Sequence, residues 1–526
     1  MTLSAALTLL EKRLARAWSA GFVTLVLACT CAPAFAAIEP AFEVGGFEAP
    51  SMDGSARLQN AMRRVSAATN DDLQSALAAV QKMANAGDAQ AAFRLGRYYH
   101  LESGHPDYVR ALTLYKQAMA HGNAWAMNNI GLLYRDGTGV QQDYPTARAY
   151  FERSAATKRN PFGFYNLALM SLEGYDGPPN VQLGLAWLDK CAALNMPLCL
   201  YVEAALYYTG DYGVPVDYAK TMALGTRASN LGDRAATWGI AKLYLLGQGT
   251  HEDVTKGMDL MRSLSDQGYA KATGSLGELY ADDKIRNEFF DGTLEGEDRV
   301  PRQFKAAVRS DVEKAIGYWE TAAQRGNCHS LLDLSSIYDR GAGVPTDYSK
   351  GAKYVEDAVK CEPNNSYYVW KLAKRLEEAK GLPKDCVAAS QLFVKSMVLG
   401  YSDAAVDLGY IFDKGCDAIR RDDKRALQIY LAGAKAGVPL CQNNVGAMLK
   451  HGRGIGGTPD TIRGYAWLTL AANNGDELAV KNLVGYQELF PEGVRKQGLQ
   501  HLEEIKKMIH PGEVDMQLLA SGDMSY

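Results

Sequence analysis

The chain has 526 residues, of which 47% are hydrophobic and 22% are charged, and its formal net charge is −4 at pH 7. This composition allows a buried core, and the length allows several ordinary domains or one long repeat array. A slightly acidic chain without a basic run that could bind phosphates excludes nucleic acid as an expected partner.

Residues 1–36 have the pattern of an export signal. Basic residues come first, an apolar segment (FVTLVLACTC) begins at Phe22, and Ala34-Phe35-Ala36 follows. A basic start, a short apolar core and an A-x-A site are typical of a signal peptide, here cleaved after Ala36. No later apolar segment reaches about 18 residues, so no further membrane span is expected.

A second processing route fits the same segment. Val26-Leu27-Ala28-Cys29 resembles the lipobox of bacterial lipoproteins, whose cysteine is lipidated and becomes the new N-terminus. Lipidated Cys29 would tether the protein to a membrane. Both routes carry the chain into an oxidising compartment, so we expect the periplasm, with an outer-membrane lipoprotein or a secreted protein as alternatives.

A repeat follows a short spacer and a candidate capping helix, which together span 37–70. From 71 to 475 the sequence recurs with a period of about 36 residues. The first half of each unit is a predicted helix, and the second half is another helix that usually ends in small residues and glycine. The first helices end in a small-residue pair and an aromatic, as in Leu95-Gly96 with Tyr99, Ile130-Gly131 with Tyr134, Leu276-Gly277 with Tyr280, and Leu408-Gly409 with Phe412.

A glycine-rich turn joins the two halves of each unit. It reads DGTGVQQDY from Asp136 and RGAGVPTDY from Arg340. Such a loop can cradle a phosphate, but its recurrence favours a helix-to-helix turn. Glycine there supplies positive φ without a Cβ penalty, and the following aspartate caps the next helix. Each hairpin leaves an apolar face uncovered, so it is stable only when stacked on its neighbours.

The pattern A-x-x-x-L-G-x-x-Y-x-x-G-x-G-V-x-x-D-x-x-K-A resembles the Sel-one-like (SLR) repeat, a relative of the tetratricopeptide repeat. The resemblance implies an all-α fold, a right-handed superhelical solenoid of about ten helix-turn-helix repeats. It also implies a concave surface lined by the first helices. The best unit carries the pattern on Ala126, Ile130, Gly131, Tyr134, Gly137, Gly139, Val140, Asp143 and Ala147.

Parts of the array depart from this pattern. The unit that begins at Glu362 has lost the Gly-x-Gly turn, and an insertion of charged residues with glycine and proline interrupts another turn at about 284–310. We expect this insertion to form a protruding loop. Residues 476–526 are expected to form C-terminal capping helices and a tail.

Nine cysteines are present, two of them in the signal peptide. Cys191 and Cys199 replace small residues of one second helix and the next first helix, positions that pack together in the resembled repeat. The pair is similar to bridges in the secreted, cysteine-rich branch of that family, so we expect a disulfide. Two further pairs, Cys328 with Cys361 and Cys386 with Cys416, are expected to come close. Cys441 repeats the position of Cys199 and faces Gly433, so it should be free.

No motif for catalysis, a cofactor or a metal stands apart from the repeat. TGSLG from Thr273 imitates a nucleophile elbow but lies inside a repeat helix, and the G-x-G-x-x-G at Gly452 occupies a turn with no strand before it. His251-Glu252 lacks the second histidine of a helical zinc motif. The secreted branch has been associated with penicillin binding, but the chain contains no Ser-x-x-Lys. We predict no enzyme activity, cofactor or metal.

The leading hypothesis is a periplasmic protein–protein interaction scaffold or regulator that binds an unidentified partner on its concave surface. The alternative is an outer-membrane lipoprotein assembly subunit for polysaccharide export or envelope biogenesis. Candidate contacts are the polar and aromatic side chains of the first helices outside the repeat pattern: Trp125, Asn128, Asn129, Asn166, Tyr201, Trp238, Tyr368, Trp370, Asn443 and Asn444.

Overall fold

The computed structural model describes residues 62, 65, 70–102, 106–290, 300–485, 487–512 and 514. The predicted signal peptide with Cys29, nearly all of the spacer, the centre of the insertion and residues 515–526 lie outside these residues. Within the described ranges the regular elements are all helices, which confirms the all-α prediction. None of these helices combines the length and the apolarity that a membrane crossing requires.

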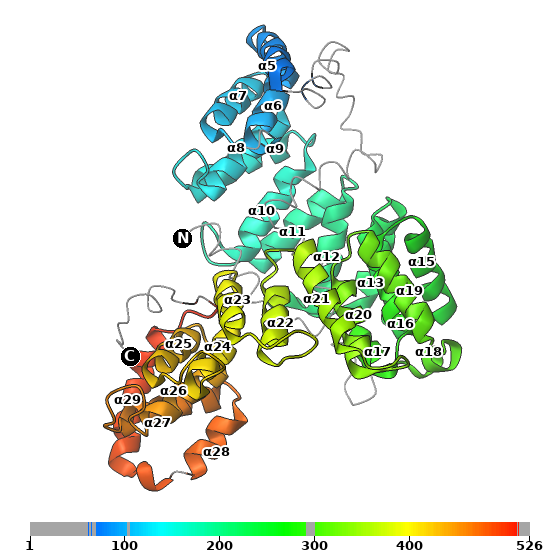
Figure 1. Ribbon diagram of the computed structural model, residues 1–526. Coiled ribbons are helices and arrows are strands. Elements are labelled where there is room, and N and C mark those ends of the chain that lie inside the picture. The colour runs from blue at the N-terminus through cyan, green and yellow to red at the C-terminus, as the bar shows by residue number, and fades with distance from the viewer. Residues whose placement is uncertain are drawn as a thin grey trace. The chain divides into compact units, whose positions relative to one another are not determined.

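The chain divides into two compact units. Figure 1 labels the helices of both. The N-terminal unit holds the described residues up to Leu264, together with 290 and 300–307. Its helices are α5 (Asn70–Asn85), α6 (Ala89–Arg97), the π-helix η1 (Tyr98–Glu102), α7 (Tyr108–Ala120), α8 (Ala124–Asp136), α9 (Tyr144–Ala156), α10 (Pro161–Glu173), α11 (Val181–Ala192), α12 (Pro197–Thr209), the 3₁₀ turn η2 (Asp211–Gly213), α13 (Tyr218–Asn230), α14 (Arg234–Leu246), α15 (Val254–Asp266), which ends at the boundary, and α18 (Arg302–Ala307).

The C-terminal unit holds Ser265–Phe289 and the described residues from Val308 onward. Its helices are α16 (Ala270–Tyr280), α17 (Asp283–Phe290), which ends at the boundary, α19 (Val312–Gln324), α20 (His329–Arg340), α21 (Tyr348–Cys361), α22 (Ser366–Glu377), α23 (Cys386–Val398), α24 (Ala404–Lys414), α25 (Asp423–Lys435), α26 (Pro439–Leu449), α27 (Thr461–Asn473), α28 (Glu477–Gly485), the 3₁₀ turn η3 (Gln487–Leu489) and α29 (Glu492–Lys507).

Within each unit the helices form hairpins of a first and a second helix, and successive hairpins stack. An aspartate begins most second helices, and its side chain accepts a hydrogen bond from the backbone N–H three residues later. Each such cap contributes on the order of 1 kcal/mol to helix stability. The capping residues are Asp107, Asp143, Asp217, Asp311, Asp347, Asp385, Asp422 and Asp460.

In several hairpins the small-residue pair of the first helix receives a large side chain from the second helix. A Cβ on Gly131 would lie 2.6 Å from the Phe151 ring, and one on Gly277 would lie 2.5 Å from the Trp319 ring. Both rings are fully buried. Glycine is therefore required in these helices because the ring fills the place of its side chain.

The Gly-x-Gly turn meets two requirements. Its first glycine ends the first helix in the left-handed conformation, with φ of 67° at Gly137. Its second glycine lies against the start of the preceding second helix, since a Cβ on Gly139 would come within 2.5 Å of the Tyr108 Cβ. The turn is thus part of the contact between repeats, which explains why it recurs.

The unit from Glu362 keeps this turn geometry although its sequence has lost the first glycine. Ala379 takes the left-handed position with φ of 56°, and Gly381 takes the second position with φ of 82° against the Tyr348 carbonyl. A left-handed conformation is unfavourable for alanine by roughly 1–2 kcal/mol. The departure seen in the sequence is therefore local strain and not a different fold.

We expect Ala379→Gly to stabilise the C-terminal unit by up to about 1 kcal/mol. Relief of left-handed strain should exceed the roughly 0.5–1 kcal/mol that glycine adds through the entropy of the unfolded chain. Urea denaturation followed by circular dichroism measures the change. Ala342→Gly, in the middle of the preceding turn where φ is not positive, should be destabilising. Equal effects of the two substitutions would contradict the strain.

The described ends of the insertion are packed helices, so the prediction of a protruding loop is wrong for them. The Phe290 and Phe304 rings lie 5.3 Å apart, and both side chains are fully buried. The backbone N–H of Phe304 donates to the Glu252 carboxylate at 3.2 Å. These buried rings hold 300–307 within the N-terminal unit. In the sequence, the charged residues around them gave no sign of this burial.

The structure brings together the three cysteine pairs that the sequence singled out, each with Cα atoms 5.9 Å apart. Cys191 and Cys199 join α11 to α12, two consecutive hairpins. Cys441 is buried and unbonded. A Cβ on Gly433 would lie 2.6 Å from the Cys441 sulfur, so this position matches the Cys191–Cys199 geometry without its second cysteine. The remaining pairs join Cys328 to Cys361 and Cys386 to Cys416.

Peptide mapping of the unreduced protein from the periplasm should give three bridged pairs and one alkylatable thiol, Cys441, after denaturation. Cys191→Ala and Cys199→Ala should each destabilise the α11–α12 junction by about 2–3 kcal/mol. The double variant should lose about as much as either single one, because both remove the same bridge. Free thiols at both positions in the exported protein would contradict this expectation.

Candidate partner-binding surface

The candidate site is the face that successive first helices present. In the described chain, polar contacts connect neighbouring first helices at one register, one or two residues before the small-residue pair. The Asn166 amide on α10 donates to Asn128 on α8 at 2.9 Å, and the Asn482 amide on α28 donates to Asn443 on α26 at 2.8 Å. These amide bridges fix the alignment of adjacent repeats.

A different pair occupies this register in the C-terminal unit. The indole N–H of Trp370 on α22 donates to the Asp407 carboxylate on α24 at 2.7 Å. The Lys374 ammonium also contacts Asp407, at 3.1 Å, and pairs with Glu377 and Glu378. Although burial alone would lower the pKa of Lys374, these carboxylates raise it above its usual value. Lys374 is therefore a fixed positive charge shared among acidic neighbours.

Three half-buried rings lie beside this pair, and we call them the aromatic cluster: Tyr367, Trp370 and Tyr401. Tyr367 stacks on Trp370 at 5.6 Å, and Tyr401 lies 5.4 Å from Trp370 and 5.9 Å from Tyr367. Burial raises the pKa of the Tyr401 phenol, and the charges of Asp403 and nearby groups raise it further. The cluster thus places three partly exposed rings next to carboxylates.

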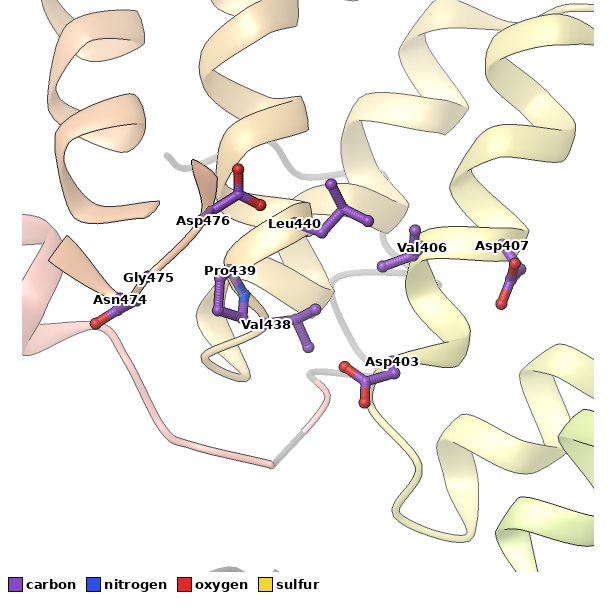
Figure 2. Close-up of a pocket in the computed structure, with 9 residues that line it drawn as sticks. All are labelled: Asp403, Val406, Asp407, Val438, Pro439, Leu440, Asn474, Gly475 and Asp476. Atoms are coloured by element: carbon purple, nitrogen blue, oxygen red, sulfur yellow. The ribbon is translucent and has the colours of Figure 1, made fainter. Parts of the chain in front are cut away.

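A groove of about 390 Å³ continues from Asp407 along the starts of α24, α26 and α28, and we call it the acidic groove. Figure 2 shows Asp403 and Asp407 on one side and Asp476 on the other, with apolar side chains between them. No basic side chain belongs to its lining among the described residues. The lining residues are Asp403, Val406, Asp407, Val438, Pro439, Leu440, Asn474, Gly475 and Asp476.

The N-terminal unit has a larger groove, of about 620 Å³, near the turn between α12 and α13. Its charged groups are already engaged. Asp217 caps α13 by accepting from the Lys220 backbone N–H at 2.9 Å, and the Lys220 ammonium donates to the Tyr207 hydroxyl at 2.6 Å. This groove therefore presents a balanced charge.

One buried carboxyl of the N-terminal unit lies at the register of the amide bridges, which we call the bridging register. Glu203 on α12 is 2% exposed, and burial raises its pKa to about 7, with the Asp189 charge as a further cause. Lys220 and Arg227 oppose the shift. The folded chain therefore binds a proton at Glu203 between its ordinary pKa of 4.5 and about 7.

This proton makes stability depend on pH. The stabilisation that protonation of Glu203 gives the folded chain is fully present below pH 4.5. It is lost as the pH rises towards 7 and beyond. Glu203→Gln should therefore lose less stability between pH 5 and pH 8 than the unmodified protein does, as measured by urea midpoints. Glu152→Gln, at an exposed position on α9, serves as the control. Identical pH profiles for all three proteins would argue against the raised pKa.

The structure buries most of the predicted contact residues. The rings contribute to the core, and the amides among them bond to neighbouring repeats or pack between them, so these side chains cannot reach a partner. Trp125, Trp370 and Asn444 remain half-exposed. Trp370 belongs to the aromatic cluster, whereas Trp125 packs on Phe162 at 5.7 Å. The buried candidates are Asn128, Asn129, Asn166, Tyr201, Trp238, Tyr368 and Asn443.

Sequence reasoning missed the acidic groove and two members of the aromatic cluster. Asp403 and Asp407 are four residues apart, so they share one face of α24 with Val406 between them. That spacing was the available signal, but it does not distinguish a groove from an ordinary solvated helix face. The groove arises only when α26 and α28 stack beside α24.

One group of side chains could approach a metal ion. Glu278, His329 and Asp333 bring one potential ligand atom each within 4.8 Å of one another, and the His329 side chain is exposed. Carboxylates and a single exposed histidine do not select a metal by themselves. The expectation of no metal and no cofactor stays a prediction.

A family model for the Sel1 repeat matches more than half of the chain. It passes over the hairpin of α22 and α23, which the structure nevertheless folds as a repeat. The nine matched segments are residues 89–123, 126–156, 165–196, 203–233, 234–269, 294–327, 329–360, 402–438 and 439–476.

Several known proteins are similar to the chain. An uncharacterized protein of Neisseria meningitidis is 23% identical over 66% of this chain and 80% of its own length. The ERAD-associated E3 ubiquitin-protein ligase component HRD3B of Arabidopsis thaliana is 24% identical in the matched region. That region covers 68% of this chain but only 54% of HRD3B. Among solved structures, a protective antigen of uropathogenic Escherichia coli that displays an SLR fold is 21% identical in sequence. The match covers 91% of this chain and 96% of that chain, with a TM-score of 0.42.

Proposed function

Because the chain belongs to the Sel1 repeat family, whose members are generally non-enzymatic scaffolds for protein–protein interaction, we propose that it is an extracytoplasmic scaffold or regulator that binds a protein partner on its first-helix surface. The observation that carries the proposal is the continuity of the aromatic cluster with the acidic groove. Aromatic side chains beside desolvated polar groups are the kind of surface at which protein interfaces concentrate their binding energy.

The extracytoplasmic location has two supports. Residues 1–36 have the basic, apolar and A-x-A pattern of an export signal. Six of the seven cysteines that follow it are paired in the structure, and disulfides persist in oxidising compartments. A scaffold in the periplasm accounts for both features.

The lipobox-like sequence that ends in Cys29 favours a second candidate, an outer-membrane lipoprotein that serves as an assembly subunit for polysaccharide export or envelope biogenesis. A tethered repeat array would hold its partner at the membrane. The mass of the mature N-terminal peptide separates the two candidates, because one begins at Ala37 and the other at an acylated Cys29.

Photo-crosslinking in bacteria that export the protein tests the binding surface. Tyr410 is 53% exposed on α24 and follows Asp407 by one helical turn, whereas Tyr348 is 47% exposed at the start of the second helix α21. A benzophenone amino acid at position 410 should give discrete protein adducts, identified by mass spectrometry. The same residue at position 348 should give few.

Equal adducts at both positions, or none at position 410, would contradict binding on the first-helix surface. Comparable export and circular dichroism of the two variants control for folding.

A further inference from the structure

We propose that the acidic groove, with the aromatic cluster beside it, recognises a basic extended segment of a partner protein in which arginine or lysine side chains alternate with apolar ones. This inference rests on the proposed function and specifies the chemistry of the partner. The carboxylates, the apolar floor and the ring faces support it independently.

Apolar side chains form the floor of the acidic groove. Val438 is buried, Pro439 is half-buried and Leu440 is 38% exposed. The groove is shallow and open to solvent, and its volume of about 390 Å³ leaves room for side chains of an extended segment. The floor therefore suits apolar side chains that alternate with polar ones along such a segment.

Carboxylates outnumber ammonium groups around this surface. The two lysines nearby are already engaged, because Lys374 lies among three carboxylates and Lys371 lies 5.4 Å from the centre of the Trp370 ring. Asp403 and Asp476 form no ion pair within the described residues, so an anionic segment would meet like charge at these two carboxylates, whereas a cationic one would neutralise it. The carboxylates are those of Glu377, Glu378, Asp403, Asp407 and Asp476.

The ring faces favour a guanidinium or ammonium group in particular. Cations bind over the faces of tryptophan and tyrosine, and arginine can also bond a carboxylate with two N–H groups. Trp370 and Tyr401 lie at the edge of the acidic groove that Asp407 shares. A basic side chain placed there would contact rings and carboxylates together.

The larger groove of the N-terminal unit lacks this selectivity. Its lining pairs a single acid, Asp217, with a single base, Lys220, whose ammonium lies over the Tyr207 ring at 4.0 Å. Charge complementarity therefore assigns the basic segment to the acidic groove.

A pair of matched double variants tests the proposal without disturbing the fold. Asp403→Asn with Asp476→Asn removes two charges from the groove, since Asp403 makes no capping hydrogen bond and asparagine can replace Asp476 as the cap of α28. Asp347→Asn with Asp357→Asn likewise removes two charges from α21, that of the capping Asp347 and that of the half-buried Asp357, which pairs with Lys360. The net charge of the two variants is identical.

The probe is a short fluorescein-labelled peptide of alternating arginine and leucine, compared with the same peptide carrying citrulline or glutamate in place of arginine. Fluorescence polarisation should show binding of the arginine peptide to the disulfide-bonded full mature protein. Affinity should fall about tenfold in the groove variant, the effect of losing two partly exposed ion pairs, and should be nearly unchanged in the α21 variant. The citrulline and glutamate peptides should bind weakly or not at all.

Equal affinity for both variants, equal binding of citrulline and arginine peptides, or no binding of the arginine peptide would overturn the inference. If adducts still form at position 410 in cells under any of these outcomes, the scaffold function stands and only the basic chemistry fails. If those adducts are absent as well, both proposals fail.

Discussion

In several hairpins, the contact between a small residue of the first helix and a large side chain of the second helix sets how closely the two helices pack. In the hairpin of α8 and α9, Phe151 occupies the space that a side chain on Gly131 would need, and the ring is fully buried. The same relation holds between Gly277 and Trp319 in α16 and α19. Because the ring fills the place of a side chain, it sets how closely the two helices approach at this point, and the next hairpin stacks on the surface that results.

Other positions of the first helix, which do not take part in this contact, can differ between repeats. Where α8 and α10 use paired asparagines at the bridging register, α22 and α24 use Trp370 and Asp407. Either pair satisfies the polar atoms between neighbouring repeats, so the stack persists. The second pair also brings a ring and a carboxylate to the surface, which turns a structural contact into a candidate recognition site.

The array could be predicted from sequence because its determinants are local: a small-residue pair, a glycine turn and a capping aspartate recur at fixed spacing. The candidate site could not, because exposure depends on which neighbour covers a side chain. Tyr368 faces the core and is 5% exposed, whereas the adjacent Tyr367 joins the aromatic cluster. Trp238 is buried although Trp125, also on a first helix, is half-exposed. The sequence indicated which types of side chain could contact a partner, but the packing of the helices determines which of them are exposed.

The elements that carry the candidate surface are also held by contacts that span repeats. The Cys386–Cys416 bridge joins the start of α23 to the turn after α24, and the Trp370–Asp407 hydrogen bond joins α22 to α24. Lys374 adds an ion pair between the same two first helices. These links leave α24 little freedom to move relative to its neighbours, so the carboxylates of Asp403 and Asp407 stay in place before a partner arrives. A surface ordered in advance loses less conformational entropy on binding. The same covalent and polar links that stabilise the stack therefore favour recognition at this position of the array.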